Sequence, residues 1–273
     1  MTALMYHDVV AAGAEDTSGF PGRDAALYKV TPQQFAAHLD AIRAATPSPP
    51  EAPDLPDPPD LPDPLDLPDP VITFDDGGIS AMTAADLLEA RGFSGHFFVT
   101  VNFVGTRGFV GKDDIRELAR RGHVVGSHSC SHPLRMGRCA WPQLVDEWTR
   151  SRAALEDILG ADVRVASVPG GDFAPPVAEA AAQAGFATLF TSEPTCASRS
   201  AFGLALHGRF TIQTWTSTAA VAGLAAGAWL PRARQALLWN AKKMSKRLGG
   251  DRYLQLRKIV LGYGNEVRWG DRN

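Results

Sequence analysis

The chain has 273 residues, of which 45% are hydrophobic, and its formal net charge is −3 at pH 7. This length suits one α/β barrel of about 250 residues, and the near-neutral charge excludes a general attraction to nucleic acid. Cys130, Cys139 and Cys196 show no C-x-x-C spacing, so we expect a reducing compartment and no disulfide framework. No basic leader followed by an apolar run opens the chain, which predicts a cytoplasmic protein.

The first predicted helix spans 31–45 and is followed by an unusual acidic repeat. Thr31 and Pro32 suit the start of that helix. Residues 54–71 then repeat Asp-Leu-Pro-Asp-Pro-x with a period of six. Proline removes backbone donors and the aspartates repel one another, so we expect a surface loop inside an insertion at 47–70. The alternative interpretation is an acidic binding arm.

Helices and strands alternate after residue 78. The predicted helices span 84–91, 113–121, 141–159 and 175–184, and the predicted strands span 95–100, 123–127, 163–168, 187–191 and 209–212. Repeated β-then-α units indicate a parallel sheet with helices outside it. In such folds the functional side chains gather at the carboxyl ends of the strands.

Two pairs of potential ligands follow predicted strands. The buried strand 71–74 ends in Asp75 and Asp76, and two glycines then allow a tight turn. His128 and His132 follow the strand at 123–127, four residues apart. One Asp and two His can bind a divalent ion and leave a position open for water. The spare Asp can accept a proton from that water.

The residues between the two histidines offer further chemistry. Ser129 and Ser131 could orient the ligands through hydrogen bonds. Cys130 could add a soft ligand, but we expect its side chain to point away. Asp-Asp-Gly alone often forms only a turn, so the metal hypothesis depends on both pairs being present.

In this order and spacing, the motifs resemble those of the polysaccharide deacetylases of the NodB-homology type, carbohydrate esterase family four. The resemblance is carried by TFDDG at 73–77, HSxxHP at 128–133 and LMYHDV at 4–9, and it spans residues 2–215. It implies an α/β fold, a deformed and incompletely closed (β/α) barrel. We place this barrel at 1–231 and a basic helical extension at 232–273.

The resemblance also implies roles for the ligand candidates and for a third motif. Asp75 is the expected general base, and the expected metal ligands are Asp76, His128 and His132. Ser167 stands where the family often has an arginine that pairs with the base. Without a nearby cation the pKa of Asp75 should fall less. The backbone N–H of Gly170 in the same motif is the expected oxyanion donor.

A final motif at 204–207 resembles the family's L-x-L-H and makes His207 the expected general acid. The family's aspartate–tryptophan motif, which supports this histidine, has no clear match between 185 and 202. His7 and Asp8 could face the site, but we expect them to be structural. Phe173 and Trp215 could stack on a sugar, but we expect each to lie in the core.

The end of the chain changes character twice. Residues 210–231 carry no charge, but they are too weakly hydrophobic to predict a transmembrane span. Residues 232–258 are strongly basic, with leucines at helical spacing opposite the lysines. Such a helix can bind the inner face of an anionic membrane, or it can cover one end of the barrel.

These observations predict a metal-dependent N-deacetylase acting on N-acetylated sugars in a polysaccharide or lipid-linked glycan. Zn²⁺ is the expected ion, and Co²⁺ or another first-row ion also fits the ligands. Peptidoglycan, chitin-like and exopolysaccharide substrates are equally compatible with the motifs. One alternative is a catalytically impaired binding or scaffold protein of a polysaccharide assembly system, which Ser167, the missing aspartate–tryptophan motif and the basic tail motivate. A non-haem iron oxygenase is another, because two His and one carboxylate also bind Fe(II).

Overall fold

The computed structural model describes residues 1–46 and 69–241. The chain divides into two compact units, Met1–Arg232 and Ala233–Asn273, and the sheet and its helices belong to the first unit. Nearly all of the predicted insertion at 47–70 lies outside the described residues. The predicted membrane-binding segment 232–258 also lies outside them from residue 242 onward, while its described part, 232–241, is helical. The surface loop and the membrane contact both stay predictions.

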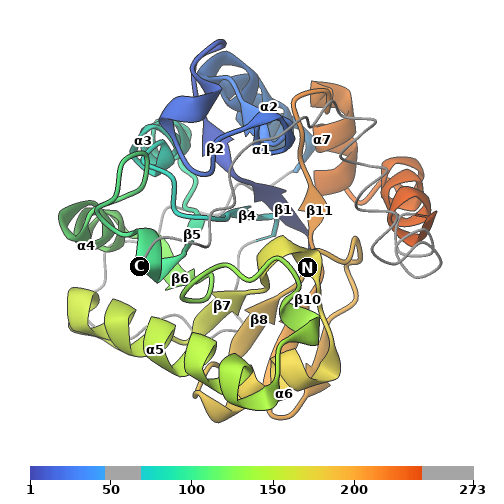
Figure 1. Ribbon diagram of the computed structural model, residues 1–273. Coiled ribbons are helices and arrows are strands. Elements are labelled where there is room, and N and C mark those ends of the chain that lie inside the picture. The colour runs from blue at the N-terminus through green and yellow to red at the C-terminus, as the bar shows by residue number, and fades with distance from the viewer. Residues whose placement is uncertain (47–68, 242–273) are drawn as a thin grey trace. The chain divides into compact units, whose positions relative to one another are not determined.

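A curled sheet forms the framework of the first unit (Figure 1). Its nine strands follow the order β11-β1-β4-β5-β6-β7-β8-β10-β9. They are β1 (Ala3–Tyr6), β4 (Val71–Phe74), β5 (His96–Val99), β6 (Val124–Ser127), β7 (Val165–Ser167), β8 (Thr188–Phe190), β9 (Arg199–Ala201), β10 (Leu204–His207) and β11 (Phe210–Thr211). Neighbouring strands run parallel, except that β9 is antiparallel to β10. The sheet ends at β11 and β9 instead of closing, so the predicted incompletely closed barrel is confirmed.

Helices surround the sheet, and a small second sheet of β2 (Asp8–Val9) and β3 (Lys29–Val30) lies beyond β1. The helices are α1 (Arg23–Ala26), α2 (Pro32–Ala45), α3 (Ala81–Glu89), α4 (Lys112–Arg120), α5 (Trp141–Leu159), α6 (Pro175–Gln183) and α7 (Thr218–Ala225). α5 has its predicted bounds, and α2 begins with a capping box in which Thr31 and Gln34 bind each other's backbone N–H. No helix in the described ranges is long and apolar enough to cross a membrane.

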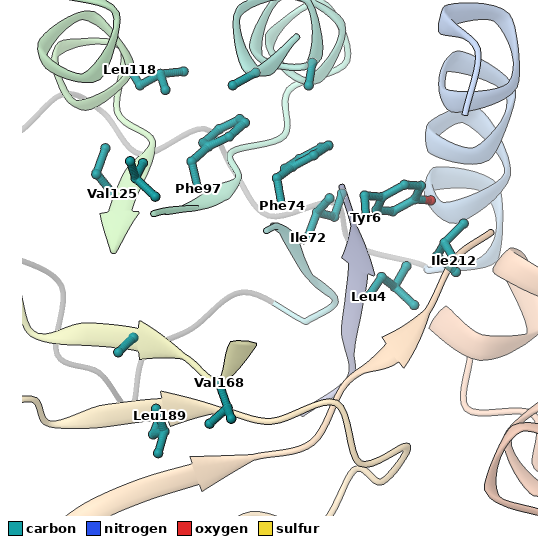
Figure 2. Close-up of a cluster of buried hydrophobic side chains, with 14 of the residues drawn as sticks. Leu4, Tyr6, Ile72, Phe74, Phe97, Leu118, Val125, Val168, Leu189 and Ile212 are labelled. Carbon is teal, nitrogen blue, oxygen red and sulfur yellow. The ribbon is translucent and has the colours of Figure 1, made fainter. Parts of the chain in front are cut away.

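Side chains alternate between the two faces of each strand, and this alternation determines which residues face the inside of the curled sheet. Figure 2 shows Tyr6, Phe74 and Phe97 pointing from their strands toward the surrounding helices, where the main core lies. Val71 belongs instead to a smaller cluster on the inner face. Because side chains alternate along a strand, Asp75 continues the inward-facing row of β4.

Candidate metal centre

Three side chains converge beyond the carboxyl ends of β4 and β6. The Oδ1 atom of Asp76 lies 3.4 Å from the Nε2 atom of His128 and 3.4 Å from that of His132. In a tetrahedral zinc site with bonds of about 2.0–2.1 Å, two ligand atoms lie about 3.3–3.4 Å apart. The same Oδ1 atom is buried and has no hydrogen-bond partner in the described part of the chain. These separations and this unpartnered oxygen fit one shared ion.

The ligands sit on a strained backbone. Asp76 has φ of 77° and His132 has φ of 56°, both in the left-handed region. Such a conformation costs about 1–3 kcal/mol for a residue other than glycine and persists only where the surroundings impose it. Gly77, with φ of 82°, passes so close to β5 that an added Cβ would lie 3.2 Å from the Cα of Val99. The turn that presents Asp76 therefore needs glycine at its next position.

Glu147 of α5 holds the loop that carries both histidines. Its carboxylate is buried, with the residue only 6% exposed, and accepts hydrogen bonds from the backbone N–H groups of Cys130 and Ser131 at 2.9 Å each. The Ser131 hydroxyl also donates to it. Ser129 acts closer to a ligand, because its hydroxyl accepts the backbone N–H of His132 at 3.1 Å.

The sequence reasoning missed Glu147. The available signal was a carboxylate on the buried face of a long amphipathic helix, beside Leu144, Trp148 and Ser151. A buried carboxylate needs partners, and the partners here come from a loop before the helix.

Ser167 connects one ligand to the expected base. Its hydroxyl oxygen lies 2.6 Å from the Nδ1 atom of His128 and donates its own proton to Asp75 at 3.0 Å. The Nδ1–H of His128 therefore points at Ser167, which leaves Nε2 as the free lone pair. Burial raises the pKa of the Cys130 thiol to about 11, and this residue lies outside the group of ligand atoms, as expected.

Arg209 supplies the cation that was expected to be missing. Its Nη1 and Nη2 atoms donate to the two carboxylate oxygens of Asp75 at 2.6 and 2.8 Å. The guanidinium is fully buried and lies 5.6 Å from the ring centre of Phe98 and 5.9 Å from that of Phe190. The expectation of an unpaired base is wrong, because the arginine comes from the segment after β10 and not from the third motif.

This pair sets the charge of Asp75. Burial alone would raise its pKa, but the Arg209 guanidinium and His128 outweigh burial and hold the pKa below its ordinary value. Asp75 is therefore ionised at neutral pH and can accept a proton.

His7 affects the charge of both aspartates, although the sequence predicted only a structural role for it. It follows β1, and its positive form would lower the pKa of both Asp75 and Asp76. Its Nδ1 atom is buried and unpartnered among the described residues. The ring of Tyr28 lies 4.8 Å from the His7 ring.

His207 contacts Ser198 and Phe190, and Phe190 also flanks the Arg209 guanidinium. Its Nδ1 atom is 2.9 Å from the Ser198 hydroxyl, and its ring is 5.4 Å from that of Phe190. Burial, followed by the positive charge of the chain's N-terminus, lowers its pKa. Its Nε2 atom is buried and has no hydrogen-bond partner among the described residues, and its general-acid role stays a prediction.

Of the remaining candidate residues, two are structural and two lie at the surface. Asp8 accepts hydrogen bonds from the hydroxyls of Ser18 and Ser80, so it is part of the frame as expected. Gly170 lies exposed in the turn after β7, and its oxyanion role stays a prediction. Phe173 packs against the core as expected. The expectation of a core Trp215 is wrong, because this residue is 63% exposed.

Known proteins resemble this chain in sequence over about half of its length. Residues 67–189 match the family model described as polysaccharide deacetylase. Over 138 residues the chain is 26% identical to YxkH of Bacillus subtilis (strain 168), a protein named as a polysaccharide deacetylase. That match covers 50% of this chain and 49% of YxkH, so the chain spans about half the length of this curated relative.

Solved structures share the fold. A polysaccharide deacetylase from Bacillus cereus, BC0361, superposes with a TM-score of 0.63 at 18% identity, over 82% of this chain and 68% of its own. The Streptococcus pyogenes deacetylase PplD, solved with acetate, gives 0.62 at 20% identity, over 80% and 95%. IcaB from Ammonifex degensii gives 0.59 at 23% identity, over 82% and 96%.

Proposed function

We propose that this chain, whose residues 67–189 match the polysaccharide deacetylase family, hydrolyses the acetamide group of N-acetylated sugars in a glycan. The observation that carries the proposal is the meeting of Asp76, His128 and His132 at ligand spacing beside the ionised Asp75. A metal-ligand group next to a separate base is an arrangement that can hydrolyse an unactivated amide.

Asp76, His128 and His132 would hold a divalent first-row ion, with Zn²⁺ as the first choice for two imidazoles and one carboxylate. Such an ion, when bound, lowers the pKa of a water molecule and polarises a carbonyl group. The protein's part is to aim these three side chains at one point and, through Glu147, to hold the loop that carries both histidines.

Asp75 is the proposed general base. Its Oδ2 atom lies 3.9 Å from the Nε2 atom of His128, so it adjoins the ligand group without belonging to it. Arg209 and Ser167 fix the direction of its carboxylate and keep it ionised. A base held in this way can take the proton of an attacking water without first moving.

The leaving amine needs a proton, and we assign its donor to His7. The support is its place directly after β1, whose Tyr6 pairs with Phe74 just before Asp75, and its buried, unpartnered Nδ1 atom. His207 is the other candidate, because its Nε2 atom is also buried and unpartnered among the described residues, while its Nδ1 atom lies 2.9 Å from the Ser198 hydroxyl.

The direct test is acetate release from N-acetylglucosamine oligomers by the zinc-loaded protein. Release by the wild-type chain supports the proposal. Binding of the oligomers with no acetate released by zinc- or cobalt-loaded protein would favour the alternative of an impaired scaffold. The ion pair between Arg209 and Asp75 removes one motive for that alternative, because the base has its cation.

A further inference from the structure

A short turn after β11 exposes a large aromatic side chain to solvent. Trp215 lies in this turn, residues 213–216, and is 63% exposed. We propose that Trp215 is a stacking platform for a second sugar ring of the substrate. The site would then take an N-acetylated oligosaccharide or longer glycan in preference to a single sugar. This inference rests on the proposed deacetylase function.

The turn is rigidly built without the help of its tryptophan. Inside it, the Thr216 N–H donates to the Gln213 carbonyl at 2.8 Å, and the Gln213 N–H donates to the Thr216 hydroxyl at 2.9 Å. The Thr214 N–H donates to the carbonyl of Leu27 at 3.0 Å. None of these bonds uses the indole, so it is free to serve another purpose.

Two side chains of α2 fix the turn from below. The Gln34 amide donates to the carbonyl of Thr214 at 2.9 Å, and the buried His38 bonds the carbonyl of Thr216 through Nε2 at 3.1 Å. Because the turn is already fixed, its backbone loses little conformational entropy when a ligand binds to Trp215.

The strand register places this turn at the rim of the proposed site. β1 and β11 pair Leu4 with Phe210 and Met5 with Thr211, and the Ile212 N–H donates to the Met5 carbonyl at 2.9 Å, so the turn leaves β11 at the end of the sheet where His7 leaves β1. Leu27, which anchors the turn, precedes Tyr28, whose ring lies 4.8 Å from that of His7. A glycan with one ring at the catalytic groups therefore passes this rim with its next ring.

The chemistry of the two partners matches. A pyranose ring presents C–H groups on its faces and hydroxyls around its edge, and an indole offers a flat apolar face with one polar N–H. Tryptophan is also among the side chains that are enriched where binding energy is concentrated. A charged or branched side chain at this position would not offer the same face.

The chain provides a matched control. Phe202 is also an exposed aromatic residue, at 51%, but it lies in the hairpin between β9 and β10, at the amino end of β10. The amino ends of the parallel strands lie opposite the ends that carry the ligands. Phe202→Ala should therefore remove a similar exposed surface without touching the proposed platform.

The experiment compares zinc-loaded wild type, Trp215→Ala, Trp215→Phe and Phe202→Ala on the tetramer and the monomer of N-acetylglucosamine. We expect Trp215→Ala to raise KM for the tetramer about tenfold while kcat, monomer turnover and the melting temperature stay unchanged. Trp215→Phe should recover most of the loss, and Phe202→Ala should behave like wild type. An unchanged KM for the tetramer in Trp215→Ala would overturn the inference.

The two proposals fail separately. If the wild type releases no acetate from either sugar, the proposed function fails, and calorimetric binding of the tetramer to the same variants decides the stacking question. Tetramer affinity that drops in Trp215→Ala and not in Phe202→Ala would still support the platform. No tetramer binding by the wild type, or equal affinity in all four proteins, would reject it.

Discussion

At the scale of single residues, the buried pair of Asp75 and Arg209 controls the base. We expect Arg209→Met to leave a buried carboxylate without its cation and to cost about 3–5 kcal/mol of folding stability. The exposed pair of Arg199 and Glu193 is the control, because Arg199→Met should change stability by about 1 kcal/mol or less. Urea unfolding measures both.

The same substitution has a pH signature. In the wild type the pKa of Asp75 is below its ordinary value, so the stability from its ionised form is present above the unfolded pKa and is lost as pH falls through the folded one. Without Arg209, burial remains and the pKa of Asp75 should rise. The acid limb of the rate profile should then move to higher pH, and an unmoved limb would contradict the role of Asp75.

A second residue-scale prediction separates His7 from His207. We expect His7→Gln to lower turnover by about 10²–10⁴-fold, the usual effect of removing a general acid, at unchanged metal content. His207→Gln should change turnover little, because its described partners are Ser198 and Phe190. Steady-state rates with metal analysis check this. The reverse result would return the acid role to His207, as the family resemblance implies.

At the scale of elements, α5 supports the metal loop through Glu147. We expect Glu147→Gln to weaken zinc binding about 10–100-fold, the usual effect of losing a partner that supports a ligand loop. Asp157→Asn makes the same carboxylate-to-amide change at an exposed position of α5 and should leave affinity unchanged. Competition with a chromophoric chelator measures affinity without any turnover. Equal affinity in the two variants would show that the loop holds its shape alone.

The acidic repeat is the element whose removal should matter least. Deleting residues 54–65 removes two full repeats and keeps Asp69, whose side chain accepts the backbone N–H of Thr2 at 2.9 Å. We expect turnover and melting temperature to stay close to wild type, because loop closure depends only weakly on loop length. A large loss of either would show that the repeat binds or packs.

Local pattern was enough to predict most elements and the ligand group. Helix 141–159 carries amphipathic spacing, and the carboxylates and histidines follow apolar strands, so both signals lie within a few neighbouring residues. Strands β2 and β3 are two residues long and give no such signal. Arg209 was missed because it meets Asp75 across 134 positions, a contact set by sheet curvature.

At the scale of the whole molecule, the curl of the open sheet assembles the site. Arg209 lies in the two-residue link between β10, near one end of the strand order, and β11 at the other end, and from there it reaches Asp75 after β4. Phe98 and Phe190 lie on the inside of the sheet and flank the guanidinium. The site therefore needs the complete curved sheet, and the matched family segment 67–189 does not include Arg209.

The proposed chemistry depends above all on the two adjacent aspartates having different tasks. Zinc content and acetate release, determined together for the wild type, Asp75→Asn and Asp76→Asn, separate these tasks. We expect Asp75→Asn to keep zinc while losing about 10²–10⁴-fold in acetate release, and Asp76→Asn to lose zinc itself. Near-normal acetate release by Asp75→Asn, or full zinc retention by Asp76→Asn, would contradict this division between base and ligand.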